Sequence, residues 1–285
     1  TSSHDVPPPV QLLQLIAGKW VEQAIYAVAE LGVADHMKEG PKTSAALAAE
    51  TQSDAASLHR LLRALASLGL FKEDAQGRFE LTPVGAMLRS DVPGSMRKFA
   101  QMVGMPCAWR AWGEILHGVK TGRSPFEHVH GESGFEYLSK HPEEASLFDG
   151  AMSSFSAGVI PAVVAAYDFS QFGNIVDVAG GRGHLLAAIL KANPRTQGIL
   201  FDMPHVTDGA RRHLEAEGVA SRAQVISGDF LQSVPGGGDA YVLKHIIHDW
   251  DDARAETILR SCRQVVPKNG KLLVLEMVIP PGNDP

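Results

Sequence analysis

Two histidines and several carboxylates follow one another closely at positions 244–252. Histidine has an ordinary pKa of about 6.5, so it can accept a proton during catalysis near neutral pH. Either His245 or His248 could be such a base. Glu276 could hold the imidazole in the productive tautomer, as carboxylates do in hydrolase triads. The run therefore predicts proton-transfer chemistry.

A metal site is the alternative interpretation of the same run, with His248, Asp249, Asp251 and Asp252 as ligands. Acids at the start of a helix are also explained as caps, because they interact favourably with the positive end of the helix. His128 and His130 could suggest a second metal site, but no further ligand lies near them in the sequence. A surface loop is the simpler interpretation there. We expect no metal.

A glycine-rich turn at 180–183 lies between an apolar, β-branched run at 175–179 and a stretch of helical composition at 184–191. Gly180, Gly181 and Gly183 let the backbone approach a ligand closely. The turn lacks the third glycine of a dinucleotide site and the Gly-Lys-Ser/Thr ending of a phosphate loop. With Asp177 in the strand, it fits a ligand with a cationic amino-acid end, such as S-adenosylmethionine. A plain tight turn is the alternative.

Strands and helices alternate after this turn. Strands are predicted at 198–202, 223–226, 239–244 and 271–277, and a helix at about 252–265. Asp202 lies where such sheets place the carboxylate that binds ribose hydroxyls, although it could instead cap the next helix. Asp229 and Phe230 could bind an adenine amino group and stack on its ring. The fold class predicted is α/β, a doubly wound, Rossmann-like parallel sheet with its ligand at the carboxyl ends of the strands.

The first third of the sequence predicts a winged helix. Helical patterns cover 10–37, with a stop at Gly32, then 43–50 and 53–69, and a β-hairpin is predicted at 70–81. DNA binding through the third helix is one interpretation. That helix offers only His59, Arg60 and Arg63 as basic residues, and the chain is acidic overall. We therefore prefer a packing and dimerisation module.

The middle of the chain, 83–169, is predicted to be helical and contains regularly spaced aromatic and methionine side chains. Such residues suit a flat organic substrate, although ordinary core packing explains any one of them. The set includes Phe99, Met102, Met105, Trp109, Trp112, Phe148, Met152 and Phe155.

The composition indicates a folded protein of about two domains. The chain has 285 residues, 45% of them hydrophobic, and a net charge of −6, which does not favour nucleic acid or anionic membranes as partners. No apolar run reaches the ~20 residues of a membrane span, and no signal peptide is recognised. Cys107 and Cys262 are interpreted as reduced cysteines that have packing roles in a cytoplasmic protein.

Four stretches resemble one known family. They are the runs at 176–184 (VDVAGGRGH), 201–206 (FDMPHV), 228–230 (GDF) and 243–252 (LKHIIHDWDD). In this order and spacing they resemble the plant caffeic-acid/hydroxyindole type of S-adenosylmethionine-dependent O-methyltransferase, including its bacterial natural-product members. The resemblance covers nearly the whole chain. It implies a dimerisation domain at 1–95, a helical substrate-pocket region at 96–170 and a cofactor-binding catalytic domain at 171–285.

The resemblance also implies a role for individual residues. The methyl donor would be held by Ser156, Asp177, Gly180, Gly181, Asp202, Met203, Asp229, Phe230 and Lys244, leaving S-adenosylhomocysteine as product. His248 would be the general base, Asp249 its neighbour that places the substrate, and Glu276 the acid that orients the histidine. Phe99, Met102, Trp109, Phe148 and Met152 would line the pocket for a small aromatic substrate with a hydroxyl expected to be phenolic. A homodimer is implied as well.

One departure concerns the end of the sequence. Members of the family continue past the fifth strand with further strands and a second glutamate that holds the histidine, so either more chain or another element is expected there. Some relatives keep the fold for decarboxylation or hydroxylation, and a non-catalytic cofactor-binding regulator and a metal-dependent catechol methyltransferase are further alternatives. The presence of both His248 and Asp249 favours methyl transfer.

Overall fold

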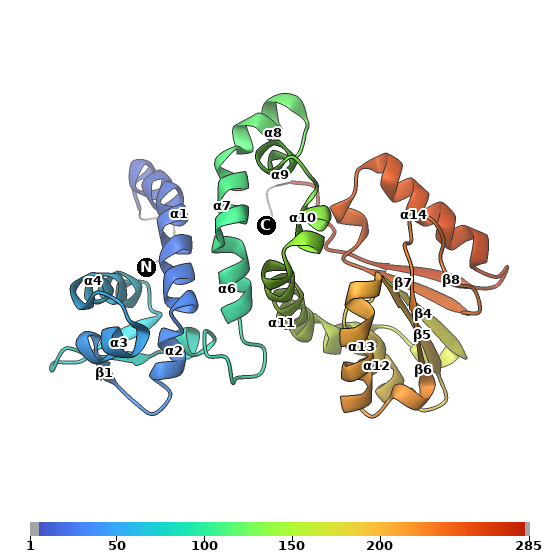
Figure 1. Cartoon of the computed structure of the whole chain (residues 1–285), viewed down its shortest axis with the longest axis horizontal. Coiled ribbons are helices and arrows are strands. Elements are labelled where there is room, and N and C mark those ends of the chain that lie inside the picture. The colour runs from blue at the N-terminus through green and yellow to red at the C-terminus, as the bar shows by residue number, and fades with distance from the viewer. Residues whose placement is uncertain (1–5, 283–285) are drawn as a thin grey trace. The chain divides into compact units, whose positions relative to one another are not determined.

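The computed structural model describes residues 6–282. The chain divides into two compact units, Thr1–Phe155 and Ser156–Pro285, and each is described by itself (Figure 1). Most of the first unit is helical, whereas the second contains a five-stranded parallel sheet with helices.

The first unit begins with α1 (Pro8–Glu30), α2 (Val33–His36), α3 (Ser44–Thr51) and α4 (Ala55–Ser67). The predicted stop at Gly32 is confirmed: its φ of 66° divides the helical stretch into α1 and α2. Thr43 and Asp54 cap α3 and α4, accepting hydrogen bonds from the amides of residues 46 and 57 at 3.2 and 2.8 Å.

A small antiparallel sheet completes this region. Its strands β1 (Lys42–Thr43), β2 (Phe71–Glu73) and β3 (Arg78–Leu81) lie in the order β1-β3-β2, so the expected hairpin is present. Phe71 and Phe79 from the hairpin are buried with Leu47, Leu62 and Leu65 from α3 and α4. The winged-helix interpretation of these elements stays a prediction.

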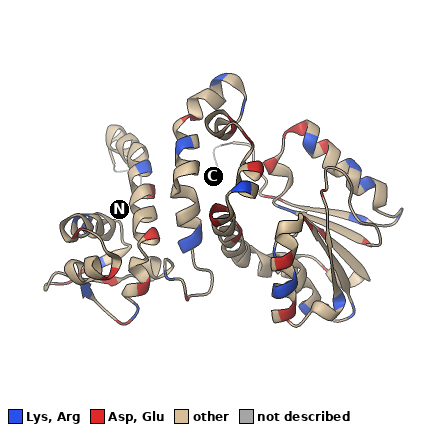
Figure 2. Cartoon of the chain, in the orientation of Figure 1, with Lys and Arg blue, Asp and Glu red and all other residues tan. Residues whose placement is uncertain are grey.

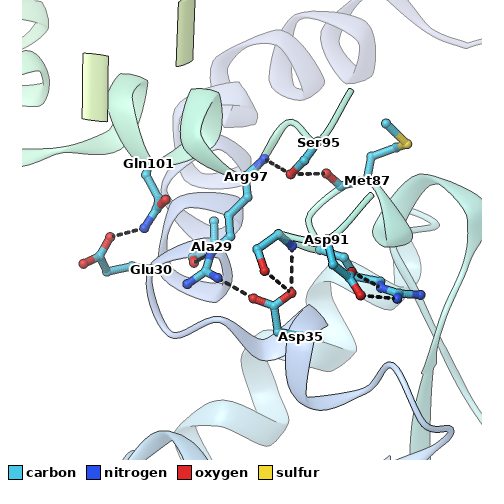
Figure 3. A network of polar contacts seen from close by, with 10 residues as sticks. Ala29, Glu30, Asp35, Met87, Asp91, Ser95, Arg97 and Gln101 are labelled. Carbon is cyan, nitrogen blue, oxygen red and sulfur yellow. Dashed lines mark hydrogen bonds and ion pairs between the residues drawn. The ribbon is translucent and has the colours of Figure 1, made fainter. Parts of the chain in front are cut away.

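Arg97 links α1, α2 and the start of α6 (Arg97–Gly104), as Figure 3 shows. Its Nε donates to the carbonyl oxygen of Ala29 at 2.8 Å, and its guanidinium pairs with Asp35. The other oxygen of Asp35 accepts from the amide and hydroxyl of Ser90 at 2.7 and 3.0 Å. Gln101, one turn further along α6, donates to Glu30 at 2.9 Å. These bonds fix α6 against the first helices.

The rest of the first unit is a series of helices that follow α5 (Pro83–Ala86) and α6: α7 (Pro106–Gly113), α8 (Ile115–Thr121), α9 (Pro125–His130) and α10 (Gly134–Lys140). The expectation of a loop at 128–130 is wrong, because these residues end α9. His128 stacks on His117 with ring centroids 3.8 Å apart, and Nε2 of His130 lies 3.0 Å from the carbonyl oxygen of Cys107. Both imidazoles thus have packing roles.

Helix α11 (Pro142–Ala166) passes from the first unit into the second. By length and composition alone it could cross a membrane, so the expectation that no segment reaches that length is wrong. Length and apolar composition alone are weak evidence for a membrane span, because core helices of soluble proteins can have both. The helix contains Pro161 and three acids near its start, Glu143, Glu144 and Asp149.

The second unit confirms the predicted doubly wound parallel sheet. Strands β4 (Asn174–Val178), β5 (Gln197–Asp202), β6 (Ala223–Ser227), β7 (Ala240–Lys244) and β8 (Lys271–Leu275) lie in the order β6-β5-β4-β7-β8 (Figure 1). The helices are α12 (His184–Ala192), α13 (Pro204–Ala216) and α14 (Asp252–Val265). Charges of both signs are interspersed along α13 and α14 (Figure 2).

Strand alternation places side chains on the two faces of this sheet. In β4, Val176 and Val178 pack with Tyr241, whereas Ile175 packs on the opposite side with Leu185 of α12. The strand order reverses between β4 and β7, which makes their carboxyl ends the expected ligand site. One boundary was predicted wrongly: β8 ends at Leu275, so Glu276 follows the strand rather than lying within it.

Candidate active site

The glycine turn after β4 has a backbone that ordinary side chains disfavour. Ala179, Gly181 and Gly183 have φ values of 54°, 59° and 81°. A Cβ on Gly180 would lie 2.7 Å from the carboxyl carbon of Asp177, and one on Gly183 would lie 2.8 Å from Leu200. Glycine is therefore required for close packing at 180 and 183, and the turn passes directly over the end of the strand.

Asp202, at the end of β5, lies beside this turn. One of its carboxylate oxygens accepts a hydrogen bond from the amide of Gly181 at 2.8 Å, and the other accepts from the amide of Met203 at 2.6 Å. The structure thus brings together two predicted cofactor positions from neighbouring strands. A carboxylate still has lone pairs left for ligand hydroxyls at such a position. The side chain of Met203 is exposed next to it.

Asp177 is a buried carboxyl group with an unsatisfied oxygen. It is 2% exposed, and within the described chain its Oδ2 has no hydrogen-bond partner. Burial raises the pKa of Asp177 to about 7, although Lys244 opposes that rise and Asp202 adds to it. A buried acceptor without a donor needs a partner or a proton, so this position fits a cationic ligand group.

Lys244, at the end of β7, reaches the second half of α11. Its Nζ donates to the hydroxyl of Ser156 at 2.9 Å, so these two predicted cofactor residues are in contact. Burial lowers the pKa of Lys244, while Asp177 and Glu276 raise it. The three strand ends of β4, β5 and β7 therefore carry one connected set of ionisable groups.

Asp229 and Phe230 follow β6 at the same edge of the sheet. The carboxylate of Asp229 accepts from the amide of Leu231 at 2.9 Å and from the side-chain amide of Gln232 at 3.2 Å. The ring of Phe230 meets Trp250 edge to face, with centroids 5.7 Å apart. An apolar ring beside a carboxylate can accommodate a purine and its amino group.

His248 is held by Glu276. Its Nδ1 lies 2.5 Å from Oε2 of Glu276, and its Nε2 lies 3.4 Å from Oδ1 of Asp249. The imidazole is 55% exposed, whereas Glu276 is 17% exposed. Because Nδ1 is engaged, Nε2 is the nitrogen available to an incoming proton. The ring of His245 lies next to it, with centroids 5.8 Å apart, and the amide of His245 donates to the carbonyl oxygen of Leu275.

Glu276 is itself fixed by the loop that carries the histidine. Its Oε1 accepts from the amides of Ile246 and Ile247, both at 2.9 Å. Burial acts to raise the pKa of Glu276, but the bonds from His248 and the two amides outweigh it and lower the pKa. Burial also raises the pKa of Asp249, against the opposing effect of His248. Glu276 is therefore an anion suited to stabilise a protonated imidazole.

The predicted substrate-pocket residues belong to the first unit. Phe99 stacks on Phe155 with ring centroids 6.0 Å apart, and Phe148 meets Phe135 edge to face at 6.2 Å. Their role in binding a substrate, with that of Met102, Trp109 and Met152, stays a prediction.

Two features of the site were not foreseen from the sequence. The amides of Ile246 and Ile247 hold Glu276, and the ring of His184, directly after the glycine turn, packs on His213. A histidine immediately after Gly183 was visible in the sequence, but its partner, 29 positions later, was not. Over residues 6–282, no group of three or more His, Cys, Asp or Glu residues is placed to hold a metal ion.

Two known domain families match the chain. The O-methyltransferase domain matches residues 112–285, more than half of the sequence, and the O-methyltransferase dimerisation domain matches residues 13–91. The chain belongs to the O-methyltransferase family.

Individual relatives agree with this assignment. The phenazine O-methyltransferase PhzM of Lysobacter antibioticus is 46% identical over 280 residues, which are 98% of this chain and 82% of the relative. The crystal structure of LaPhzM has a TM-score of 0.94 at 46% identity, covering 98% of this chain and 84% of that one. The O-methyltransferase NcsB1 from neocarzinostatin biosynthesis, solved with S-adenosylmethionine and 2-hydroxy-5-methyl naphthoic acid, has a TM-score of 0.80 at 36% identity, covering 90% and 80%.

This chain is therefore an S-adenosylmethionine-dependent O-methyltransferase of the bacterial natural-product branch. Its sheet and glycine turn are those of class I methyltransferases, and its N-terminal part is a dimerisation domain. The fold, the methyl donor and the reaction class predicted from the sequence are confirmed.

Proposed function

We propose that this enzyme methylates a phenolic hydroxyl of a small aromatic natural product, with His248 as general base. The observation that carries the proposal is the contact between Nδ1 of His248 and Glu276, which leaves Nε2 of the half-exposed imidazole to accept a proton at the carboxyl edge of the sheet. A phenol has a pKa of about 10, so little of it is ionised at neutral pH and a base increases its nucleophilicity.

His248 takes the phenolic proton on Nε2. Glu276 stabilises the imidazolium that forms, and its two backbone hydrogen bonds keep it from rotating away. Asp249 lies 3.4 Å from Nε2 and helps to place the substrate hydroxyl. Holding the reacting oxygen in line for transfer supplies much of the rate.

The cofactor residues divide by chemistry. Gly180, Gly181 and Ser156 hold the amino-acid end of S-adenosylmethionine, with the unpaired oxygen of Asp177 facing its positive charge. Asp202 binds the ribose hydroxyls. Met203, Asp229, Phe230 and Lys244 surround the adenine. When bound, the cofactor supplies an electrophilic methyl group on a sulfonium.

The substrate is proposed to lie against the side chains of Phe99, Met102, Trp109, Phe148 and Met152. Their aromatic and thioether groups suit a flat ring system. Relatives named for hydroxybenzoate, hydroxynaphthoate and phenazine substrates support a substrate of one to three rings.

We further propose a cytoplasmic homodimer, with 1–95 as the dimerisation domain, 96–170 as the substrate-pocket region and 171–285 as the catalytic domain. Helix α1 supports the dimer, because Leu12, Leu13, Leu15, Ile16 and Trp20 are exposed on it. The two buried, unpaired cysteines are compatible with a reducing compartment. No nucleic acid or membrane partner is proposed.

The proposal is tested by measuring S-adenosylhomocysteine formation against a panel of hydroxylated phenazines, naphthoates and benzoates, with mass spectrometry of each product. A phenolic methyl ether as product supports the proposal. Cofactor binding with only decarboxylated, hydroxylated or N-methylated products, or with none at all, would reject it.

A further inference from the structure

His184 and His213 form a contact that the methyl-transfer reaction does not use. Their ring centroids lie 4.0 Å apart at an angle of 58°. His184 is the first residue of α12 and follows Gly183 directly, while His213 lies near the end of α13. The pair therefore joins the helix that begins at the cofactor turn to the helix that follows Asp202.

Both imidazoles are neutral at pH 7. Burial lowers the pKa of His184 to about 4, helped by His213, Arg182 and Lys244, with Glu217 acting in the opposite direction. Burial also lowers the pKa of His213. Lys191 and Arg182 lower this pKa further, whereas Glu217 acts to raise it. A proton on either ring would place a cation among other cations in a partly buried site.

Neighbouring contacts show that α12 has little freedom to move relative to α13. A Cβ on Gly183 would lie 3.3 Å from Leu214, and one on Gly209 would lie 3.9 Å from Arg182. Lys191, in the last turn of α12, pairs with Glu217, which directly follows α13. Because the amide of Gly181 also bonds to Asp202, a displacement of the first turn of α12 would be transmitted to both cofactor-binding positions.

We propose that His184 is a positioning residue for the cofactor turn: its uncharged ring, packed on His213, holds Gly181 and Asp202 in the arrangement that binds S-adenosylmethionine. A positive charge at position 184 pushes α12 away from α13 and weakens cofactor binding. This inference concerns cofactor binding alone and does not depend on which residue is the catalytic base.

The test compares two substitutions in the full-length enzyme. His184→Phe keeps an aromatic ring without a titratable group, and His184→Lys carries a permanent charge. We expect the Kd for S-adenosylhomocysteine, measured by calorimetry at pH 7.5, to stay within about threefold for the Phe variant and to rise about tenfold or more for the Lys variant. The KM for S-adenosylmethionine should rise with it, and kcat should change less.

Leu190→Ala is the matched control, because Leu190 is buried on the same helix away from the turn. It should lower Tm while the Kd stays close to that of the wild type, which separates positioning from general destabilisation. Between pH 5.5 and 4.0, where a ring with a pKa of about 4 takes up its proton, the wild type should lose more affinity than His184→Phe, a comparison that does not require the Lys variant to fold. His205 is exposed at the start of α13, so His205→Gln should lose as much affinity in acid as the wild type does.

Two results would overturn the proposal. One is a folded Lys variant that binds S-adenosylhomocysteine as tightly as the wild type. The other is an equal loss of affinity in acid for the wild type and the Phe variant.

Discussion

Glu276 has three hydrogen bonds, and together they explain why His248 is oriented for catalysis. Two backbone amides of the 245–249 loop bind one oxygen, and the imidazole binds the other. The carboxylate is thus fixed by the same loop that it orients, so the orientation does not depend on a flexible side chain alone. Such support of a reacting group by fixed neighbours is a common source of catalytic rate.

Glu276→Gln tests this arrangement. The amide can still accept from the loop, but its NH₂ group then faces Nδ1 and favours the wrong tautomer of His248. We expect kcat to fall by roughly 10²-fold or more, as for asparagine in place of the aspartate of a catalytic triad. The Kd for S-adenosylhomocysteine should stay unchanged. A kcat equal to that of the wild type would show that Glu276 does not orient the base.

Asp177 makes the stability of the cofactor-free enzyme depend on pH. Its folded pKa of about 7 lies above the ordinary 3.8, so the folded enzyme holds a proton that the unfolded chain has released. The resulting stability is present below pH 4 and is lost as the pH rises through 7. We expect Asp177→Asn to raise Tm by several degrees relative to the wild type at pH 8.5, with a smaller difference at pH 5.5. Equal differences at both pH values would contradict the raised pKa.

At this scale the sequence alone could identify the residue types but not the contacts. Proton-transfer chemistry left His245 and His248 equivalent, and the family resemblance was needed to choose between them. The contact of Glu276 with the loop after β7 depends on the parallel pairing of β7 with β8. Local propensity does not describe such pairings, which is also why the end of β8 was placed two residues too late.

Over residues 6–282, the first turns of helix α1 carry a group of exposed apolar side chains. Leu15 and Trp20 are 78% and 61% exposed, while Val28 and Ala29 at the other end of the helix are buried. The helix therefore contributes to the core of its own unit through its last turns. Its first turns are free to pack against a second copy.

Leu15→Lys combined with Trp20→Ser should convert the proposed dimer into a monomer, because a charge and a loss of apolar area would both be placed in the interface. Light scattering should report half the mass, with the helical content unchanged. Val119→Lys, an equally exposed apolar position on α8, is the control and should remain dimeric. A double variant with the wild-type mass would exclude the start of α1 from the interface.

Elements with strong local signals were predictable from the sequence. The caps Thr43 and Asp54, the hairpin and the five strands follow from turn residues and periodicity. The short helices α8 and α9 were not resolved from one another, because their contacts, such as the stack of His117 on His128, are tertiary. At 128–130 the histidine pair was placed in a loop for the same reason.

At the scale of the whole molecule, the proposed cofactor residues belong to one compact unit and the proposed substrate residues to the other. The order of strands and the four motifs made the fold and the methyl donor predictable from the sequence. The identity of the substrate was not, because it depends on the shape of a pocket rather than on any motif.

The whole enzyme should work without a metal ion. The described residues contain no cluster of potential metal ligands, and the base proposed here needs none. We expect an excess of chelator to change the rate of S-adenosylhomocysteine formation by less than about twofold, and added magnesium to have no effect. A rate that chelator abolishes and magnesium restores would instead indicate a metal-dependent methyltransferase.

The most direct measurement compares methyl transfer by the wild type and His248→Ala on one accepted phenol, with the cofactor affinity of each measured by calorimetry. We predict that kcat falls by about 10²–10⁴-fold, the usual contribution of a general base, while the Kd for S-adenosylhomocysteine is unchanged. Turnover that survives the substitution would contradict the assignment of His248 as the base.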